Sequence, residues 1–468
     1  MHRFLSQKLL QWKERPTRHP LILRGARQVG KTYLVRELAQ SSFAHFIEVN
    51  FEADATLSSF FSSKDPSVIC ELLSAKYSVP VIYGQTLLFL DELQAAPPFV
   101  LESLRYFYEK RPGLHVIAAG SLLEFLLEQS NPEPARHFPM PVGRLEYMYV
   151  PPLQFEEFLL AAGQSGLVDW LGGYQVGTVE PEGLHRELSL WLRRYLAIGG
   201  MPAVAQAYFG GDITAAQREQ QLLLATYHDD FPKYGRHASP ALLQKVFLAI
   251  PAMLGHKLVF SHIDTCVKAR DLSEAFNRLC QARVVAKIRH TPANGIPIGF
   301  GANGTTFKPL FLDVGLACRA LGLSLADFVM EDTALLENRG EICEQFIGQH
   351  LLYAGEEYEE PSAYYWQREA RGASAEVDYI VQTGNEIVPV EVKSGRTGSL
   401  KGLHLFLNEK HRSFAVRFNA DLPSLLEDAC LKDTAGRECR FTLLSLPLYL
   451  VGQLPRLLRE RAYWRKTQ

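Results

Sequence analysis

The sequence predicts a multidomain α/β protein, and three features of the 468-residue chain lead to that prediction. Short apolar runs alternate with helical patterns over the first 150 residues, which is typical of a parallel sheet covered on both faces. The strand patterns then fade until about residue 250, where the apolar spacing favours helices. Near the carboxyl end, a second α/β unit is predicted by the runs AEVDYIV and EIVPVEVKSG on either side of the turn residues QTGN. At ~100–200 residues per domain, the length allows about three domains.

The composition is that of a globular cytoplasmic protein, and we expect no membrane association. The net charge of -2 gives no general attraction to nucleic acid or anionic lipid, so any DNA-binding surface must be local. No run reaches the ~18 apolar residues that a spanning helix requires. The seven cysteines are scattered without a CxxC pair or a zinc spacing, which indicates small buried thiols in a reducing compartment, without disulfides or structural zinc.

A nucleotide-phosphate loop is predicted directly after the first strand, PLILRG. Residues 25–32 read GARQVGKT and fit GxxxxGK[ST], in which backbone NH groups surround phosphate at the start of a helix. Lys31 would reach the terminal phosphates of ATP, and Thr32 would supply an oxygen to Mg²⁺. The other members of the loop are Gly25, Ala26, Arg27, Gln28, Val29 and Gly30.

The run LLFLDEL at 87–93 supplies the carboxylates that such a loop needs for hydrolysis. Its apolar residues predict a buried strand that delivers Asp91 and Glu92 at its carboxyl end. Asp91 would hold the Mg²⁺ shell, and Glu92 would polarise the attacking water. The alternative is a surface acidic pair that follows a core strand.

Two further residues are candidates for the nucleotide site. Ser121 ends the third strand, HVIAAGS, where it would lie between the two motifs and sense the γ-phosphate, or would cap the next helix instead. Arg144, in PVGRLEY, is a candidate arginine finger that stabilises charge at the nucleotide, acting within its own chain or from a neighbouring subunit. A surface arginine is the alternative for Arg144.

The middle of the chain offers a possible DNA-binding element. A helix around DLSEAFNRLCQA, the strand VVAKIRH, a loop rich in Gly, Asn and Pro, and then FKPLFLD together predict a winged helix. Its basic residues Arg270, Arg278, Lys287 and Arg289 would contact phosphates, unless the winged helix serves only in domain packing. The run HDD at 228–230 resembles a metal cluster but lacks a second set of ligands, so we interpret it as a helix end.

The carboxyl-terminal strands carry the parts of a metal-dependent phosphodiesterase. Asp378 and Glu391, thirteen residues apart on adjacent strands, can share Mg²⁺ or Mn²⁺, and Lys393 points to the same face as Glu391. The metal would polarise the phosphate and activate a water, which Lys393 would orient. Glu344 lies on the core-facing stripe of a helix, so its carboxylate needs a partner that a metal site would supply. The spacing resembles the PD-(D/E)xK nuclease core; the alternative is an ordinary hairpin with its polar residues facing water.

Segments along nearly the whole chain resemble a large prokaryotic family of AAA-type ATPases that carry a carboxyl-terminal restriction-endonuclease-like domain. They read GARQVGKT, FLDELQ, AAGSLLEFLL, GRLEYMYVPPLQFEEF, YLAIGGMP, KPLFLDVGLA, GEICEQF, AEVDYIV and PVEVKSG. The resemblance implies an ATPase module, a winged-helix-like linker and a nuclease-like terminus. It also supports Arg144, because the GR dipeptide occupies the family's position before the PLxFxEF segment.

Five segments follow from these observations. We expect a P-loop ATPase core at 1–152, a helical lid at 153–235, a winged-helix-like domain at 236–315, a restriction-endonuclease-like domain at 316–440 and a basic tail at 441–468. The tail is interpreted as a solvated helix, with a nucleic-acid contact as the alternative. Its basic residues include Arg456, Arg459, Arg461, Arg465 and Lys466.

Two functions of different classes fit the sequence. The first is an ATP hydrolase whose nucleotide state controls a nuclease-like domain acting on DNA, with ATP, Mg²⁺ and, at the nuclease-like site, Mn²⁺ as candidate cofactors. The second is a regulatory ATPase switch that binds DNA or a protein partner and keeps the terminal fold as an inert scaffold. A homo-oligomer is expected if Arg144 acts between subunits. A protein-remodelling motor is less well supported, because the sequence has no distinct pore-loop signature.

Overall fold

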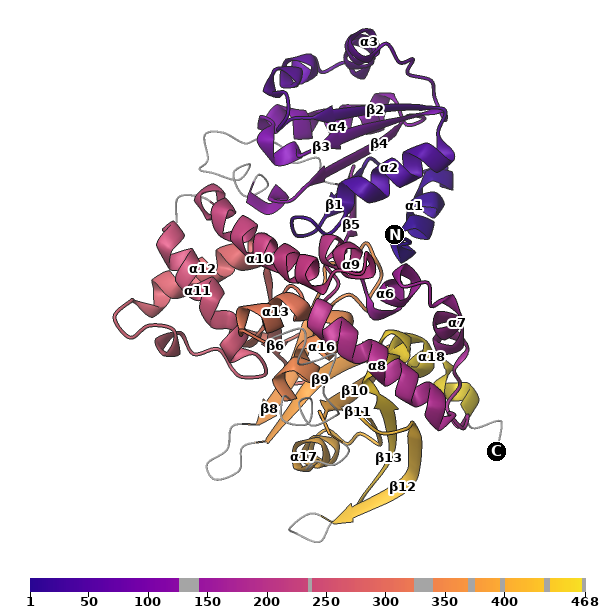
Figure 1. The fold of residues 1–468 in the computed structure, drawn as a ribbon, viewed down its shortest axis with the longest axis vertical. Coiled ribbons are helices and arrows are strands. Elements are labelled where there is room, and N and C mark those ends of the chain that lie inside the picture. The colour runs from indigo at the N-terminus through magenta and orange to yellow at the C-terminus, as the bar shows by residue number, and fades with distance from the viewer. Residues whose placement is uncertain are drawn as a thin grey trace.

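The protein is described by a computed structural model that covers residues 1–125, 143–234, 238–323, 340–368, 375–395, 400–432 and 438–464. Over these ranges the strands form two sheets, one of five and one of eight strands. Figure 1 shows the five-stranded sheet with its helices at one end of the molecule and the eight-stranded sheet at the other, with a group of helices between them. No helix of the described chain is both long and apolar enough to span a membrane.

The amino-terminal sheet is parallel throughout, as the alternation of strands and helices predicts, and its strand order is β2-β3-β4-β1-β5. Alternate residues of each strand point to opposite faces, so Leu21 and Leu23 join one core cluster and Ile22 joins another. Helices α1 and α2 cover the first face, and α3 and α4 cover the second. The elements are α1 (Phe4–Glu14), β1 (Leu21–Arg24), α2 (Lys31–Ser42), β2 (His45–Asn50), η1 (Ala55–Ser62), α3 (Pro66–Tyr77), β3 (Thr86–Asp91), η2 (Leu93–Ala95), α4 (Pro98–Lys110), β4 (His115–Gly120) and β5 (Glu146–Tyr149).

Helices then follow one another, as the apolar spacing predicts. Several begin with a recognisable signal: α10 has Asp212 as its N-cap, and α11 has Ser239 as its N-cap with Pro240 at its first position. The helices are α6 (Phe155–Ala161), α7 (Ser165–Gly173), α8 (Glu182–Ile198), α9 (Pro202–Phe209), α10 (Ile213–Asp230), η3 (Phe231–Lys233), α11 (Pro240–Ala249), η4 (Ile250–Met253), η5 (Phe260–His262) and α12 (Ala269–Gln281).

The second sheet has the order β12-β13-β11-β10-β9-β8-β6-β7. Strands β6 and β7 pair antiparallel, as the strands of a wing would, but β6 also pairs in parallel with β8. One sheet therefore continues across residue 315, and the boundaries between the expected segments remain predictions. The elements are β6 (Val285–His290), β7 (Asn303–Phe311), α13 (Val314–Ala320), α16 (Gly340–Leu352), β8 (Ala363–Arg368), β9 (Ala375–Thr383), β10 (Glu386–Val392), α17 (Lys401–Glu409), β11 (Phe414–Asn419), β12 (Ser424–Lys432), β13 (Glu438–Pro447), η6 (Leu448–Gln453) and α18 (Leu454–Trp464).

The carboxyl-terminal helix α18 is packed against the protein rather than solvated on all sides. Its residues Leu454, Leu457 and Leu458 are buried, which gives the helix an apolar face. Arg456 donates to the carbonyl oxygen of Tyr174 at 2.8 Å, and Arg461 stacks on an aromatic ring of the sheet. The interpretation of the tail as a solvated helix is corrected for these residues, while Arg465 and Lys466 lie outside the described part of the chain.

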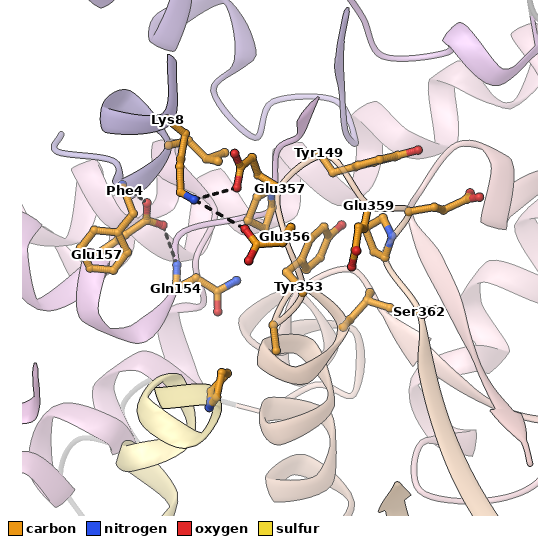
Figure 2. Close-up of a pocket in the computed structure, with 18 of the residues that line it drawn as sticks. Phe4, Lys8, Tyr149, Gln154, Glu157, Tyr353, Glu356, Glu357, Glu359 and Ser362 are labelled. Carbon is orange, nitrogen blue, oxygen red and sulfur yellow. Dashed lines mark hydrogen bonds and ion pairs between the residues drawn. The ribbon is translucent and has the colours of Figure 1, made fainter. Parts of the chain in front are cut away.

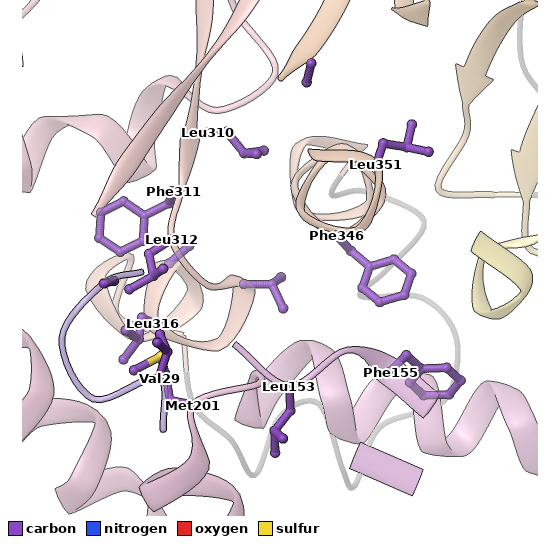
Figure 3. Packing of buried hydrophobic residues seen from close by; sticks show 14 of the residues in the cluster. Val29, Leu153, Phe155, Met201, Leu310, Phe311, Leu312, Leu316, Phe346 and Leu351 are labelled. Carbon is purple, nitrogen blue, oxygen red and sulfur yellow. The ribbon is translucent and has the colours of Figure 1, made fainter. Parts of the chain in front are cut away.

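One hydrophobic core connects the two ends of the molecule. Val29 of the phosphate loop, Leu153, Met201 and Phe346 of α16 belong to the same cluster of buried residues, as Figure 3 shows. Protein interiors are close-packed, so a change in one part of such a cluster is transmitted to its neighbours. The two predicted sites therefore rest on one continuous packed body.

Candidate functional site

The predicted phosphate loop joins β1 to α2 and has the backbone geometry of an anion site. Gly30, the residue before α2, has φ 96°, a left-handed conformation that favours glycine, and no side chain caps the helix. A Cβ added at Gly25 would lie 2.5 Å from the carbonyl oxygen of Val150, so a larger residue does not fit there. The amide groups at an uncapped helix start are free to bind phosphate oxygens.

Lys31 is buried inside this loop. Its Nζ donates to the carbonyl oxygens of Gly25 at 2.9 Å and Ala26 at 2.7 Å. Burial lowers the pKa of Lys31 to about 8, although the carboxylates of Glu92 and Asp91 oppose the shift. Charge-assisted bonds to phosphate are stronger than bonds to neutral carbonyls, so the terminal phosphates of a nucleotide would compete well for this amine.

Thr32 and Asp91 lie together at the carboxyl end of β3, where the sequence predicts the Mg²⁺ ligands. The Thr32 hydroxyl donates to Asp91 Oδ2 at 3.0 Å, and Asp91 Oδ1 accepts from the backbone NH of Glu92. Burial, followed by the charge of Glu92, raises the pKa of Asp91 to about 6. A hydroxyl and a carboxylate at this position are the hard oxygen ligands that Mg²⁺ takes alongside nucleotide phosphates, so the site fits Mg-ATP.

Glu92 sits in a conformation that non-glycine residues rarely adopt, with φ 51°. Such backbone strain is found preferentially at functional sites. The Glu92 carboxylate accepts from the side-chain amide of Gln94, which lies against Gly120 at the end of β4. Gln94 Oε1 and Ser121 Oγ are buried without a hydrogen-bond partner among the described residues. These two unsatisfied polar atoms, just after the ends of β3 and β4, mark a place where a ligand or water would bind.

Arg144 does not lie beside the phosphate loop of its own chain. It precedes β5, whose residue Glu146 is in register with Leu21 at the start of β1, whereas the loop follows the end of β1. At ~3.3 Å per strand residue, Arg144 is roughly 20 Å away along the sheet. Its Nε lies 3.3 Å from Glu109 Oε1, and 42% of its side chain is exposed. Within one chain, the structure brings together all the predicted nucleotide-site residues except Arg144.

The end of α10 contacts the phosphate loop, which the sequence did not predict. Helix α10 ends at Asp230, as expected for the HDD run, and both Asp230 carboxylate oxygens accept from Arg27 at 2.7 Å. Burial lowers the pKa of Arg27, but Asp230 outweighs that effect and the pKa is raised. The Tyr227 hydroxyl also donates to the carbonyl oxygen of Arg27 at 2.8 Å. These contacts cross about 200 positions of sequence, so no local pattern could have indicated them.

At the carboxyl-terminal site, the strand register brings Asp378 and Glu391 together. Tyr379 is paired with Val390 in the antiparallel pair β9–β10, so the next pair in that register is Asp378 opposite Glu391. Directly opposed residues have their Cβ atoms ~5 Å apart. Lys393 Nζ lies 2.5 Å from Glu391 Oε1, whereas Glu391 Oε2 is buried with no partner among the described residues. Burial, followed by the charge of Asp378, raises the pKa of Glu391.

Glu344 reaches the same cluster from α16, but its partner is a lysine that the sequence analysis missed. Lys308, on β7, is 1% exposed, and its Nζ lies 3.4 Å from Glu344 Oε2 and 3.9 Å from Asp378 Oδ1. It also forms an ion pair with Glu376. Burial alone would lower the pKa of Lys308, but the three carboxylates outweigh that effect and the pKa is raised. Lys308 therefore gives Glu344 a partner within the protein, and a role of Glu344 at a metal site remains a prediction.

These contacts leave one carboxylate oxygen of the cluster without a partner among the described residues. Glu391 Oε2 is the orphaned acceptor, and the Asp378 carboxylate is its neighbour in register. Over the described ranges, no group of three or more His, Cys, Asp or Glu side chains is arranged to hold a metal ion. Carboxylate oxygens are ligands of the kind that divalent cations take, and a cation here would complete its coordination with water or substrate oxygens.

The predicted DNA-contacting residues of the middle segment are partly engaged within the protein. Arg278 is buried and pairs with Glu274 at 3.0 Å. Lys287 donates to the side chain of Asn277 at 2.7 Å. These contacts fit the packing alternative for the two residues.

A separate cavity of about 370 Å³ lies between α1, the segment after α16 and α18. Figure 2 shows Lys8 directed toward Glu356 and Glu357, and Lys8 Nζ lies 2.9 Å from Glu357 Oε2. Tyr149 and Tyr353 also line the cavity. None of the site residues predicted from the sequence is in its wall.

Comparison with known families defines the class of the amino-terminal unit. Residues 17–159 match a family model described as an AAA domain. With the phosphate loop and the Thr32–Asp91 pair, this match makes the unit an AAA-type P-loop ATPase domain. Residues 189–327 and 339–425 match two domains of unknown function, DUF8612 and DUF4143.

Solved structures similar to the chain include two archaeal proteins. One is the Walker-type ATPase PABY2304 of Pyrococcus abyssi, with 15% identity, 68% of this chain and 94% of that chain covered, and a TM-score of 0.42. The other is Cdc6p from Pyrobaculum aerophilum, with 14% identity, 70% and 94% covered, and a TM-score of 0.24. Among curated proteins, the chain has no match.

Proposed function

We propose that the protein hydrolyses Mg-ATP and that its nucleotide state controls a metal-dependent phosphodiesterase site acting on DNA. The observation that carries the nuclease part is the pair Asp378 and Glu391, opposed across two strands beside Lys393, with Glu391 Oε2 lacking a partner among the described residues. An unsatisfied buried carboxylate oxygen is costly unless a ligand completes the site.

In the ATPase domain, the backbone amides of residues 25–32 bind the phosphates. Lys31 would exchange its two carbonyl partners for the terminal phosphates, and Thr32 and Asp91 would hold Mg²⁺, which would neutralise phosphate charge. Glu92 accepts a proton from the attacking water and orients it, while Ser121 and Gln94 contact the γ-phosphate or that water. The unsatisfied atoms of Ser121 and Gln94 support this role.

Control of the second site by the first is supported by helix α16, which joins the carboxylate cluster to the helices that follow the ATPase core. It carries Glu344 at the carboxylate cluster, and its Gln349 donates to the Tyr195 hydroxyl at 3.1 Å. Its His350 accepts from the backbone NH of Phe155 at 3.0 Å, directly after the ATPase core. A movement of the ATPase core that is passed on to α16 through these contacts would therefore shift Glu344, and with it the cluster.

In the carboxyl-terminal site, Asp378 and Glu391 would hold one divalent ion, which polarises the phosphate and lowers the pKa of a water molecule. Lys393, held by Glu391, would orient the water or stabilise the charge that develops on the phosphate. The half-buried position of Lys393 leaves it accessible to a substrate from outside.

A second candidate function is the regulatory switch with an inert terminal fold. It is favoured by the ion pairs of Lys308, which satisfy much of the carboxylate cluster without a metal. In that case ATP turnover would alter binding of DNA or a protein partner, and no strand would be cut.

Cleavage assays on plasmid, linear and single-stranded DNA, with Mg²⁺ or Mn²⁺ and with or without ATP, test the proposal. Asp378→Ala should abolish cleavage and leave ATP hydrolysis intact, whereas Glu92→Gln should bind ATP but hydrolyse it ~10²-fold or more slowly. Asp428→Ala, at an exposed aspartate of the same sheet, is the matched control. If the wild type cuts no DNA under any of these conditions, the switch is the function that remains.

A further inference from the structure

Lys308 comes from strand β7, outside the segment that carries the other members of the carboxylate site. It is buried, and its ion pairs are with Glu344, Glu376 and Asp378. Glu391 pairs with Lys393 instead. The cluster thus has two halves: one in which Lys308 already occupies the space between carboxylates, and one in which Glu391 Oε2 remains without a described partner.

The formal charges of the cluster define how many divalent ions it can accept. With all four carboxylates ionised, as metal binding requires, Glu344, Glu376, Asp378 and Glu391 face two ammonium groups, so the formal charge is -4 + 2 = -2. One divalent cation would bring that charge to zero, and a second would leave an excess of +2. Buried charges are tolerated when they are paired, which favours the first arrangement.

We propose that Lys308 serves as a built-in cation on the Glu344 side of the site, so that the site takes one divalent metal ion, between Asp378 and Glu391. Glu344 is then a partner of Lys308 and not a metal ligand. This inference rests on the proposed nuclease function. It adds the number of metal ions that the nuclease-like site takes and a role for a lysine outside the predicted motif.

Mn²⁺ titration of the nucleotide-free full-length protein, followed by calorimetry and by electron paramagnetic resonance, tests the inference. Lys308→Met keeps most of the length of the side chain and removes its charge, so Glu344, Glu376 and Asp378 become available to a second ion. We expect the wild type to bind one Mn²⁺ ion that Asp378→Ala does not bind. We expect Lys308→Met to bind one Mn²⁺ ion more than the wild type. Lys287→Met is the matched control, because Lys287 lies on the neighbouring strand β6 and pairs with Asn277.

Loss of Lys308 leaves three carboxylates close together, so Lys308→Met is expected to melt at a lower temperature in EDTA and to recover in Mn²⁺ by more than the wild type does. Glu344→Gln gives a second test that does not depend on this variant. If Glu344 is not a ligand, its substitution should change the Mn²⁺ dissociation constant less than threefold. A tenfold or larger loss of affinity would overturn the inference.

The remaining outcomes separate the inference from the function on which it rests. Two Mn²⁺ ions at the wild-type site, or one ion in both the wild type and Lys308→Met, would remove the role of Lys308 but leave a metal-dependent site. If Asp378→Ala binds as many Mn²⁺ ions as the wild type, the metal site itself is ruled out, and the proposed nuclease function with it.

Discussion

The lysines of the two candidate sites have different partners. In the nucleotide site, Lys31 is held by two neutral carbonyl oxygens, and the arginine expected to complete the site lies near the opposite end of the strands. In the carboxylate site, Lys308 and Lys393 already pair with acids. Under the proposed function, the first site would therefore need a nucleotide, and a neighbouring chain if Arg144 takes part, whereas the second would need a cation.

Among the variants that test this difference between the two sites, the largest effect is expected for Arg144. If Arg144 completes the nucleotide site of a neighbouring subunit, Arg144→Ala should lower the rate of ATP hydrolysis ~10³-fold and leave ATP binding intact. Mixing Arg144→Ala with Lys31→Ala protein should restore hydrolysis, because each mixed interface can combine one intact loop with one intact arginine.

Arg105→Ala is the control for Arg144, because Arg105 pairs with the same Glu109. Steady-state ATPase assays of the single variants and of the mixture measure the effect. Wild-type hydrolysis by Arg144→Ala alone would show that the nucleotide site is complete without this arginine.

The next largest effect is on nucleotide affinity. Lys31→Ala removes the buried amine that would meet the terminal phosphates, and charge-assisted hydrogen bonds contribute ~1.5–3 kcal/mol each, so two of them correspond to ~10²–10³-fold or more in affinity. Calorimetric titration with Mg-ATP measures the loss. Mn²⁺ binding at the carboxylate site should stay as in the wild type, since that site lies in the other sheet.

Lys76→Ala, at an exposed lysine of α3, is the control for Lys31→Ala. Unchanged Mg-ATP affinity in Lys31→Ala would mean that the carbonyl contacts of Lys31 serve the fold of the loop and not the ligand.

How much the sequence predicted depended on whether the partners were close along the chain. Asp378 and Glu391 lie on two strands joined by a short turn, so their spacing alone predicted their meeting. The Asp230–Arg27 contact and the Lys308 ion pairs join elements far apart in sequence, and nothing local to either partner marks them. Glu344 falls between these cases: the helical stripe indicated that it needs a partner, but the packing of α16 against β7 determined which one.

A smaller effect is expected at the contact between the phosphate loop and α10. Asp230→Asn removes the carboxylate that contacts Arg27 at 2.7 Å and leaves only the longer ion pair with Glu52, at 3.7 Å, so the free energy of unfolding should fall by about 2–3 kcal/mol. Arg27→Gln should cost a similar amount, and the double variant should cost less than the sum, because both changes remove the same interaction. Denaturant unfolding of the four proteins gives the coupling energy.

Asp229→Asn is the matched control for Asp230→Asn, since Asp229 is the adjacent residue and its side chain is 79% exposed. Equal losses of stability in Asp229→Asn and Asp230→Asn would contradict a specific contact between α10 and the phosphate loop.

The smallest expected effect concerns His350, on the helix that connects the two regions. Burial lowers the pKa of His350 to about 4, and its Nε2 accepts the hydrogen bond from Phe155, so the folded protein holds this ring neutral. Between about pH 4 and pH 6.5 the unfolded chain binds more protons at this residue than the folded protein does, so its contribution to stability is lost as the pH falls through that window. At pH 5 the loss should be about 1–2 kcal/mol relative to pH 8.

His350→Gln keeps an acceptor but does not titrate, so the difference in unfolding free energy between pH 8 and pH 5 should shrink by that amount. His256→Gln, at an exposed histidine, should leave that difference unchanged. An identical pH dependence in His350→Gln and the wild type would mean that the contact between α16 and Phe155 is not sensitive to acid.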